Sequence, residues 1–260
     1  MSLNPAVQTT SAGEPKVVFA DMGGLEYAEK SGGGWAIKNI ATDTNIPFHS
    51  FVIDKDGVPH VVYYSGTESK LYYATSNGAT WTTTDIAAVN DDASSDSCIV
   101  RSISLAASSG GELGLAYACN SETMYEDYYL KYAGFDGSWK VDTIKHVSGV
   151  GFDGWTASLA FSGEEPLVAA AVLTDSLRLY RRSGGSWIDL EIEAAMPVSV
   201  IGTAAFMWPS LAVDSRGNPA VAYAAYSSGT ASHVIKYAAY DGSSWKKTAV
   251  DSYPSPLFPL

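Results

Sequence analysis

Residues 210–245 read SLAVDSRGNPAVAYAAYSSGTASHVIKYAAYDGSSW, and this stretch decides the fold. It opens with a small apolar run (SLAV, 210–213), which a DSRGN turn joins to a second apolar run that begins at Pro219. A third run, IKYA (235–238), leads through the turn YDGSS to Trp245. Short apolar runs separated by Gly, Asn and Asp turns are typical of antiparallel strands joined by hairpins. The stretch therefore predicts three consecutive strands and a fourth (KKTAV) directly after the Trp.

The same pattern occurs five times along the chain. Each copy has a strand like IKYA, and a Trp follows it behind a Gly-rich or Asp/Asn-Gly turn. The strands are LEYA (25–28), LYYA (71–74), LKYA (130–133), LRLY (177–180) and IKYA (235–238), and their tryptophans are Trp35, Trp81, Trp139, Trp187 and Trp245. Self-similarity at a period of about fifty residues indicates a repeat architecture.

Four short strands per unit, repeated five times, are typical of a β-propeller. We predict an all-β fold: a single β-propeller with five blades of four antiparallel strands, strand one lining the axis and strand four outermost. The turn tryptophans and the aromatic residues of strand three are expected to pack between neighbouring blades. The blades are expected at residues 4–41, 46–88, 98–146, 155–193 and 207–250, followed by a C-terminal tail at 251–260.

The blade pattern resembles the sialidase-like Asp-box (BNR) propellers over residues 4–250, most closely in SLAVDSRGNPAVAY…IKYAAYDGSSW. The resemblance implies the propeller fold, but its motifs are turn and packing motifs. Sialidases of this family carry a FRIP motif, whose Arg begins a three-arginine clamp on the substrate carboxylate. The matching residues here are Phe206, Met207, Trp208 and Pro209, with Met207 at the Arg position. Sialidase activity is therefore not expected.

The charge of the chain excludes several partners. Its 28 acidic and 16 basic side chains give a net charge of −12, which is unsuited to a nucleic-acid backbone. No apolar run approaches the ~20 residues that a membrane-spanning helix requires. The four histidines (His49, His60, His146 and His233) are spread over three predicted blades without metal-ligand spacing. We therefore expect a monomer with no metal, no cofactor, no nucleic-acid partner and no transmembrane segment.

Cys98 and Cys119 are the only cysteines. They flank a predicted hairpin around SSGG (108–111), in which Ala106 pairs with Leu113, so they should lie nearly opposite each other at its far end. This placement suits a disulfide, and the alternative is two small buried side chains in a reducing compartment. A disulfide predicts an exported protein (secreted, periplasmic or at the cell surface) whose signal peptide is absent from this sequence.

The loops after strands two and four share one face of a propeller, which we call the loop face, and such loops commonly carry function. Blades three and five have the longer loops there, which predicts a groove above the shorter blade four. Aromatic and carboxylate side chains in this groove suit stacking on sugar rings and bonding to hydroxyls. The candidate ligand-binding residues are Asp92, Asp96, Arg101, Tyr125, Glu126, Asp127, Asp153, Trp155, Trp208, Tyr226 and His233.

Three classes of function fit these observations. We favour a carbohydrate-binding or protein-interaction module without chemistry of its own, because the sequence contains no recognisable catalytic constellation. The first alternative is a glycoside hydrolase, other than a sialidase, whose two carboxylates come from the loops of blades three and five. The second alternative is a structural domain of a larger surface protein.

Overall fold

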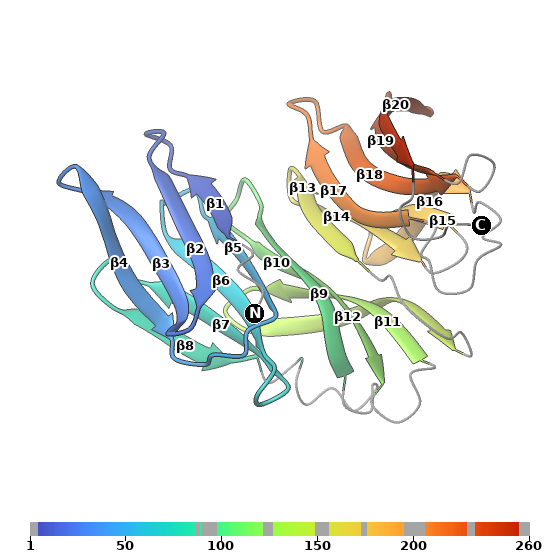
Figure 1. Ribbon diagram of the computed structural model, residues 1–260. Helices are drawn as coiled ribbons and strands as arrows, with labels where there is room; N and C mark the ends of the chain where they lie inside the picture. Colours follow the sequence, from blue (N-terminus) through green and yellow to red (C-terminus); the bar gives the residue numbers. More distant parts are fainter. Residues whose placement is uncertain are drawn as a thin grey trace.

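The computed structural model describes residues 5–86, 89, 98–121, 127–148, 156–172, 176–194, 206–227 and 232–254. In these residues, twenty strands form five antiparallel sheets of four strands each (Figure 1). Within every sheet, the four strands are consecutive in the chain and lie in chain order. The all-β prediction with four antiparallel strands per blade is therefore confirmed. In the described part of the chain, no helix has the length and apolar character to cross a membrane.

We number the sheets as blades one to five in chain order. Blade one contains β1 (Ala6–Thr9), β2 (Pro15–Asp21), β3 (Gly24–Ser31) and β4 (Gly34–Ala41). Blade two contains β5 (Phe48–Ile53), β6 (Pro59–Ser65), β7 (Lys70–Ser76) and β8 (Trp81–Asp85). Blade three contains β9 (Cys98–Ala107), β10 (Leu113–Ser121), β11 (Asp127–Phe135) and β12 (Trp139–Ser148).

The last two blades follow the same scheme. Blade four contains β13 (Ala157–Ser162), β14 (Glu165–Val172), β15 (Ser176–Ser183) and β16 (Ser186–Ala194). Blade five contains β17 (Phe206–Val213), β18 (Pro219–Ser227), β19 (Ser232–Tyr240) and β20 (Trp245–Pro254). Residues 251–254 thus belong to β20, whereas the sequence placed them in a tail. The Pro254 ring is tolerated because β20 is an edge strand whose outer side needs no ladder hydrogen bond.

The first strand of each blade lines the axis, as predicted. Successive first strands lie against each other: β1 against β5, β5 against β9, β9 against β13 and β13 against β17. A serine on the inner strand of one blade accepts a hydrogen bond from a backbone amide of the next blade. The pairs are Leu105 N to Ser50 Oγ (2.9 Å), Leu159 N to Ser104 Oγ (2.9 Å) and Leu211 N to Ser158 Oγ (3.0 Å).

Aromatic contacts join successive blades at one repeated position. The strand-three Tyr of a blade meets the turn Trp of the next blade edge to face, with ring centroids 5.2–5.6 Å apart. The pairs are Tyr27–Trp81, Tyr73–Trp139 and Tyr132–Trp187. Between blades four and five, Trp245 packs against a cluster that contains Leu179. The predicted packing role of these residues is confirmed.

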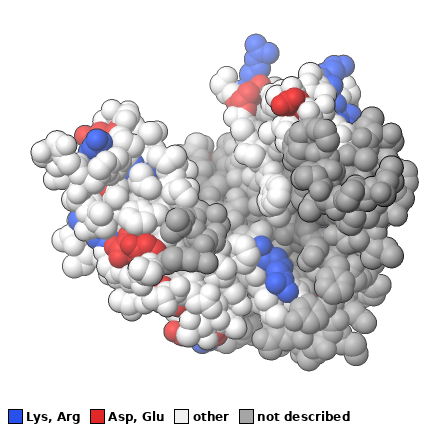
Figure 2. Space-filling view, viewed as in Figure 1, with Lys and Arg blue, Asp and Glu red and all other residues white. Residues whose placement is uncertain are grey.

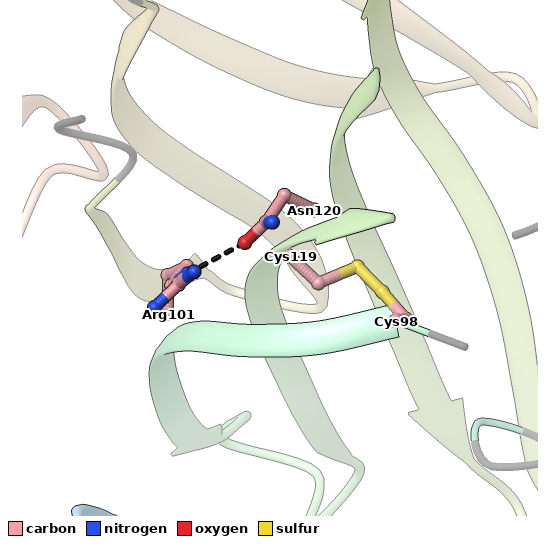
Figure 3. The surroundings of a disulfide bond; sticks show 4 residues. All are labelled: Cys98, Arg101, Cys119 and Asn120. Atoms are coloured by element: carbon pink, nitrogen blue, oxygen red, sulfur yellow. Dashed lines mark hydrogen bonds between the residues drawn. A yellow bond between two sulfur atoms is a disulfide. The ribbon is translucent and has the colours of Figure 1, made fainter. Parts of the chain in front are cut away.

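Cys98 and Cys119 form a disulfide between β9 and β10, with their Cα atoms 5.4 Å apart (Figure 3). The predicted hairpin register is wrong by one residue, because Ala106 pairs with Gly114 rather than with Leu113. A bulge at Ala118 and Cys119 then shifts the register again, so that Cys119 lies opposite Val100. The bridge tolerates this offset because Cα atoms at this separation fit disulfide geometry.

Blades one and five do not meet. They lie at the two ends of the row of blades, and the ribbons of β1–β4 lie apart from those of β17–β20 (Figure 1). The space-filling view shows an open wedge between the two ends (Figure 2). Four clusters of buried apolar side chains join the five blades, one at each contact between successive blades. Among the described residues, no corresponding cluster joins blade five to blade one.

Candidate functional site

A cavity of about 640 Å³ lies between blades one and two on the loop face. The end of β4 and the 42–44 loop form the side contributed by blade one, and β6, β7, β8 and the hairpin loop after β6 form the other side. Its volume lies within the usual range for ligand sites. The lining residues are Asn39, Ile40, Ala41, Thr42, Asp43, Thr44, Tyr63, Ser65, Thr67, Glu68, Tyr72 and Thr83.

Backbone and side-chain hydrogen bonds hold the two loops of this cavity together. Gly66 N donates to Asn45 O over 2.8 Å, and Thr67 Oγ1 donates to Asp43 Oδ1 over 3.0 Å. The same Asp43 oxygen accepts Asn45 N at 2.9 Å. A Cβ at position 66 would lie 2.5 Å from Asn45 Nδ2, so a larger residue there would displace the Asn45 side chain. The loops are therefore fixed relative to each other without a ligand.

Two tyrosines form the aromatic wall of the cavity. Tyr63 on β6 and Tyr72 on β7 are cross-strand neighbours, and their rings stack with centroids 5.4 Å apart at 20°. The Tyr72 hydroxyl donates to Glu68 Oε2 over 2.5 Å, which fixes the position of the Glu68 carboxylate. Aromatic rings beside a fixed carboxylate and several hydroxyls are the groups that bind the apolar and polar faces of a sugar.

The cavity is an acidic environment. Burial opposes ionisation of Asp43, but hydrogen bonds from Ser65, the Asn45 amide and Thr67 outweigh it and hold the pKa of this carboxyl below its usual value. Burial raises the pKa of Tyr63 to about 12. The hydrogen bond to Glu68 raises the pKa of Tyr72 well above its ordinary value. No Lys or Arg is among the lining residues. The site therefore presents carboxylates and neutral hydroxyls, which disfavours an anionic ligand.

Six of the residues that the sequence singled out lie outside the described part of the chain. They are Asp92, Asp96, Tyr125, Glu126, Asp153 and Trp155. The predicted groove above blade four stays a prediction for that reason. Five candidates are described: Arg101, Asp127, Trp208, Tyr226 and His233.

Arg101 and Trp208 lie near the beginning of β9 and β17, the inner strands of blades three and five. Arg101 Nε donates to Asn120 Oδ1 over 2.5 Å, beside the disulfide (Figure 3). Trp208 lies in a bulge of β17 with a φ of 48°, and its side chain is 69% exposed. An exposed Trp in a left-handed backbone conformation is unusual, and such strain is concentrated at functional positions.

The other described candidates are engaged in local contacts. Asp127 Oδ1 lies 3.1 Å from His146 Nε2 across β11 and β12. Tyr226 and His233 pair between β18 and β19. His233 is only 6% exposed, so its side chain is buried and does not form an open groove wall.

The sequence did not single out the cavity between blades one and two. One signal was present: the second position of each strand-three tetrapeptide is Glu26, Tyr72, Lys131, Arg178 or Lys236. Only blade two has an aromatic residue, Tyr72, at this second position. The tyrosine at its third position, Tyr73, packs between blades. Alternation along a strand directs these two tyrosines to opposite faces of the sheet. The exceptional Tyr72 was therefore a detectable candidate.

A second hydrogen-bonded group, in blade two, is structural. His60 Nδ1 lies 2.6 Å from the Tyr73 hydroxyl, and His60 Nε2 lies 3.1 Å from Asp54 Oδ2. His60 and Tyr73 are both buried, and Tyr73 packs against Trp139 of blade three. The described residues contain no cluster of three or more potential metal ligands.

Five consecutive four-stranded antiparallel sheets, with their first strands side by side, are the architecture of a β-propeller. Solved structures of this class are similar to the chain over almost all of its length. A point mutant of the Aleuria aurantia lectin in complex with Fucalpha1-6GlcNAc is 16% identical with a TM-score of 0.60, and the match covers 95% of this chain and 78% of that one. Another structure of that lectin is described as a six-bladed β-propeller with a novel fucose recognition mode.

Two further solved structures are similar to this chain. AofleA from Arthrobotrys oligospora is 12% identical with a TM-score of 0.57, covering 91% of this chain and 68% of that one. The SapL1 lectin in complex with alpha methyl fucoside is 16% identical with a TM-score of 0.57, covering 98% and 83%. The sequence matches no protein-family model and no curated protein. At these identities the similarity establishes the propeller fold.

Proposed function

We propose that this protein is a carbohydrate-binding β-propeller that takes a neutral sugar into the cavity between blades one and two. The observation that carries the proposal is the stacked pair Tyr63–Tyr72 beside the Glu68 carboxylate, in a cavity rich in hydroxyl groups. Sugars bind by stacking their apolar face on an aromatic ring while their hydroxyls bond to carboxylates and hydroxyls. The fucosides named with the structurally similar lectins are the first ligands to test.

We also propose that the protein is exported and that it is related to the Asp-box propellers. The Cys98–Cys119 disulfide is typical of exported proteins. The relation to Asp-box propellers is supported by the turns before the tryptophans. In blade five, Asp241 Oδ1 accepts the amides of Ser243 (3.0 Å) and Ser244 (2.9 Å), and Asn77 in blade two accepts two amides in the same way.

The test is a glycan array followed by calorimetric titration of the best neutral ligand. Tyr72→Ala removes one stacking ring and should weaken binding about tenfold, which corresponds to about 1.4 kcal/mol. Glu68→Gln keeps the shape of the side chain and should also weaken binding, because a neutral acceptor forms weaker hydrogen bonds. Glu165→Gln is the matched control, since Glu165 pairs with Arg181 on blade four, away from the cavity.

Trp208→Ala distinguishes this cavity from the groove that the sequence predicts. If affinity falls in Trp208→Ala but not in Tyr72→Ala or Glu68→Gln, the sugar binds near blade five and the proposed cavity is wrong. If no glycan binds at all, the carbohydrate-binding function itself is refuted. Turnover of a glycoside during the titration would favour the hydrolase alternative.

A further inference from the structure

The wedge between blades one and five has two walls with exposed apolar side chains, and several of these side chains occupy positions that are buried in the other blades. The wall on blade one, here called the front wall, follows a row across its four strands. Val7 pairs with Val17, Val17 with Ala28, and Ala28 with Ile37. Trp35 extends the same face of the sheet, and Val7, Trp35 and Ile37 are 63%, 46% and 60% exposed.

The wall on blade five, here called the back wall, contains Ser210, Ala222, Tyr237 and Val250. Ser210 pairs with Ala222 and Ala222 with Tyr237, so the three lie on one face. Tyr237 is 45% exposed and Val250 is 66% exposed. Ser210 is exposed as well, although the serines at its position in other blades accept an amide from the next inner strand.

The equivalent residues in other blades show what these walls normally contact. Tyr73 and Tyr132 occupy the position of Tyr237, and each is buried against the turn Trp of the following blade. Ile86 and Ile192 occupy the position of Val250, five residues after the turn Trp, and both are buried. Trp81 occupies the position of Trp35 and packs on Tyr27 of the preceding blade. Tyr237 therefore lacks a following blade, and Trp35 lacks a preceding one.

We propose that the wedge binds one further four-stranded antiparallel sheet, supplied by a separate polypeptide, which closes the ring as a sixth blade. The five blades match a six-bladed lectin over 95% of this chain and cover 78% of that lectin, so they follow a six-bladed ring with one blade missing. The inserted sheet would present a Trp and small apolar residues to the back wall, and a Tyr and an Ile or Val to the front wall.

Residues 1–260 do not provide that sheet, and neither does a second copy of them. The twenty strands of the described residues are already paired in the five blades, and the longest run outside them, 195–205, is too short for four strands. In a second copy, only the front and back walls are free, because the other blade faces pack against each other. If the first or last blade of that copy entered the wedge, it would cover one wall of this chain, and the remaining blades of the copy would collide with this ring. The partner is therefore a single blade with both faces free.

The test uses the whole protein and a peptide of residues 46–86 as the probe. This segment is blade two, and its two faces already pack on surfaces like the two walls of the wedge. Trp81 packs on Tyr27 of blade one, and Tyr73 packs on Trp139 of blade three. Because a single blade is only marginally stable in isolation, a second arm fuses the same segment to the C-terminus through a Gly/Ser linker. Hydroxyl-radical footprinting with mass spectrometry then measures the exposure of Trp35 and Tyr237, with buried Tyr73 as the internal reference.

Both arms should reduce the labelling of Trp35 and Tyr237 several-fold and leave that of Tyr73 unchanged. Ile37→Asp and Val250→Asp, which place a charge on the front and back walls, should abolish this protection. Ile188→Asp is the matched control, because Ile188 is exposed on the outer strand of blade four rather than on a wall.

Three results would overturn the proposal. Unchanged labelling of Trp35 and Tyr237 in both arms would show that the wedge does not accept a blade. Protection of both residues in the monomer alone would show that the ring closes on itself. Protection that appears only with dimerisation would assign the walls to a second copy. None of these results depends on whether the cavity binds a sugar.

Discussion

The side chain of Asp54, at the turn after β5, stabilises blade two through several hydrogen bonds. Asp54 follows β5, and its Oδ1 accepts the amides of Asp56 (2.9 Å) and Val58 (2.8 Å) while Oδ2 lies beside His60. Burial opposes the charge on Asp54, but His60 and the two amides outweigh it and lower the pKa of this carboxyl below its ordinary value of 3.8. One residue therefore links the turn, the strand and the buried His60–Tyr73 pair.

Asp54→Ala should lower the free energy of unfolding at neutral pH by about 2 kcal/mol, because it removes charge-assisted hydrogen bonds to two amides and His60. Since the folded pKa is depressed, this contribution is complete above the unfolded value and is lost as the pH falls from about 3.8 toward the folded pKa. Urea unfolding at several pH values measures both effects. The difference between Asp54→Ala and the wild type should therefore shrink in acid.

Asp56→Ala is the control for this prediction. Asp56 is exposed and pairs only with the neighbouring Lys55, so its loss should change stability little. Equal effects of the two substitutions would contradict the proposed role of Asp54.

At the scale of elements, each turn Trp joins two blades, except the first. Trp187 packs on Tyr132 of the preceding blade with centroids 5.3 Å apart, whereas Trp35 is 46% exposed beside the wedge. Trp187→Ala should cost about 3 kcal/mol, because it leaves a cavity between blades three and four. Trp35→Ala should cost about 1 kcal/mol or less. Chemical denaturation compares the two, and similar costs would mean that Trp35 is buried against another blade in solution.

The disulfide stabilises one hairpin of blade three. It closes a loop with a sequence separation of 21 residues, and removing such a bridge should cost about 3 kcal/mol through the gain in unfolded-state entropy. The double variant Cys98→Ser/Cys119→Ser should therefore unfold at lower urea concentration, with a somewhat steeper slope because the unfolded chain without the bridge exposes more surface. Addition of a reductant should shift the wild type by the same amount and leave the variant unaffected. A reductant effect on the variant would point to a cause other than this bridge.

At the scale of the whole molecule, charge limits the ligands. The net charge is −12, and the cavity between blades one and two has carboxylates but no Lys or Arg among its lining residues. Neutral sugars should bind with an affinity that hardly changes between low and high salt, because no ion pair forms. Sialylated or sulfated sugars should bind more weakly, most clearly at low salt. Titrations at two ionic strengths check this, and tighter binding of an anionic sugar would contradict the proposed site.

The repeat, the order of strands and the residues between the blades could be predicted from the amino-acid sequence. These features are local: hairpin turns, alternation of side chains and the distance from strand three to the turn Trp are all written within one unit of the chain. For this reason Tyr27, Tyr73 and Tyr132 were assigned to blade packing before their contacts were known. The Cys98–Cys119 pair was also found from the hairpin, although the register was wrong by one residue because hairpin turns fix it only approximately.

The positions of the cavity and of the wedge could not be predicted from the sequence, because they depend on how whole blades pack. The cavity requires Asp43 of one loop, Glu68 of another and Tyr63 on a strand to meet across two blades, and no spacing within a single unit encodes that meeting. The openness of the ring depends on the angle between successive blades. That angle accumulates over four contacts between blades, so a small difference at each one decides whether five blades close a ring or leave room for a sixth.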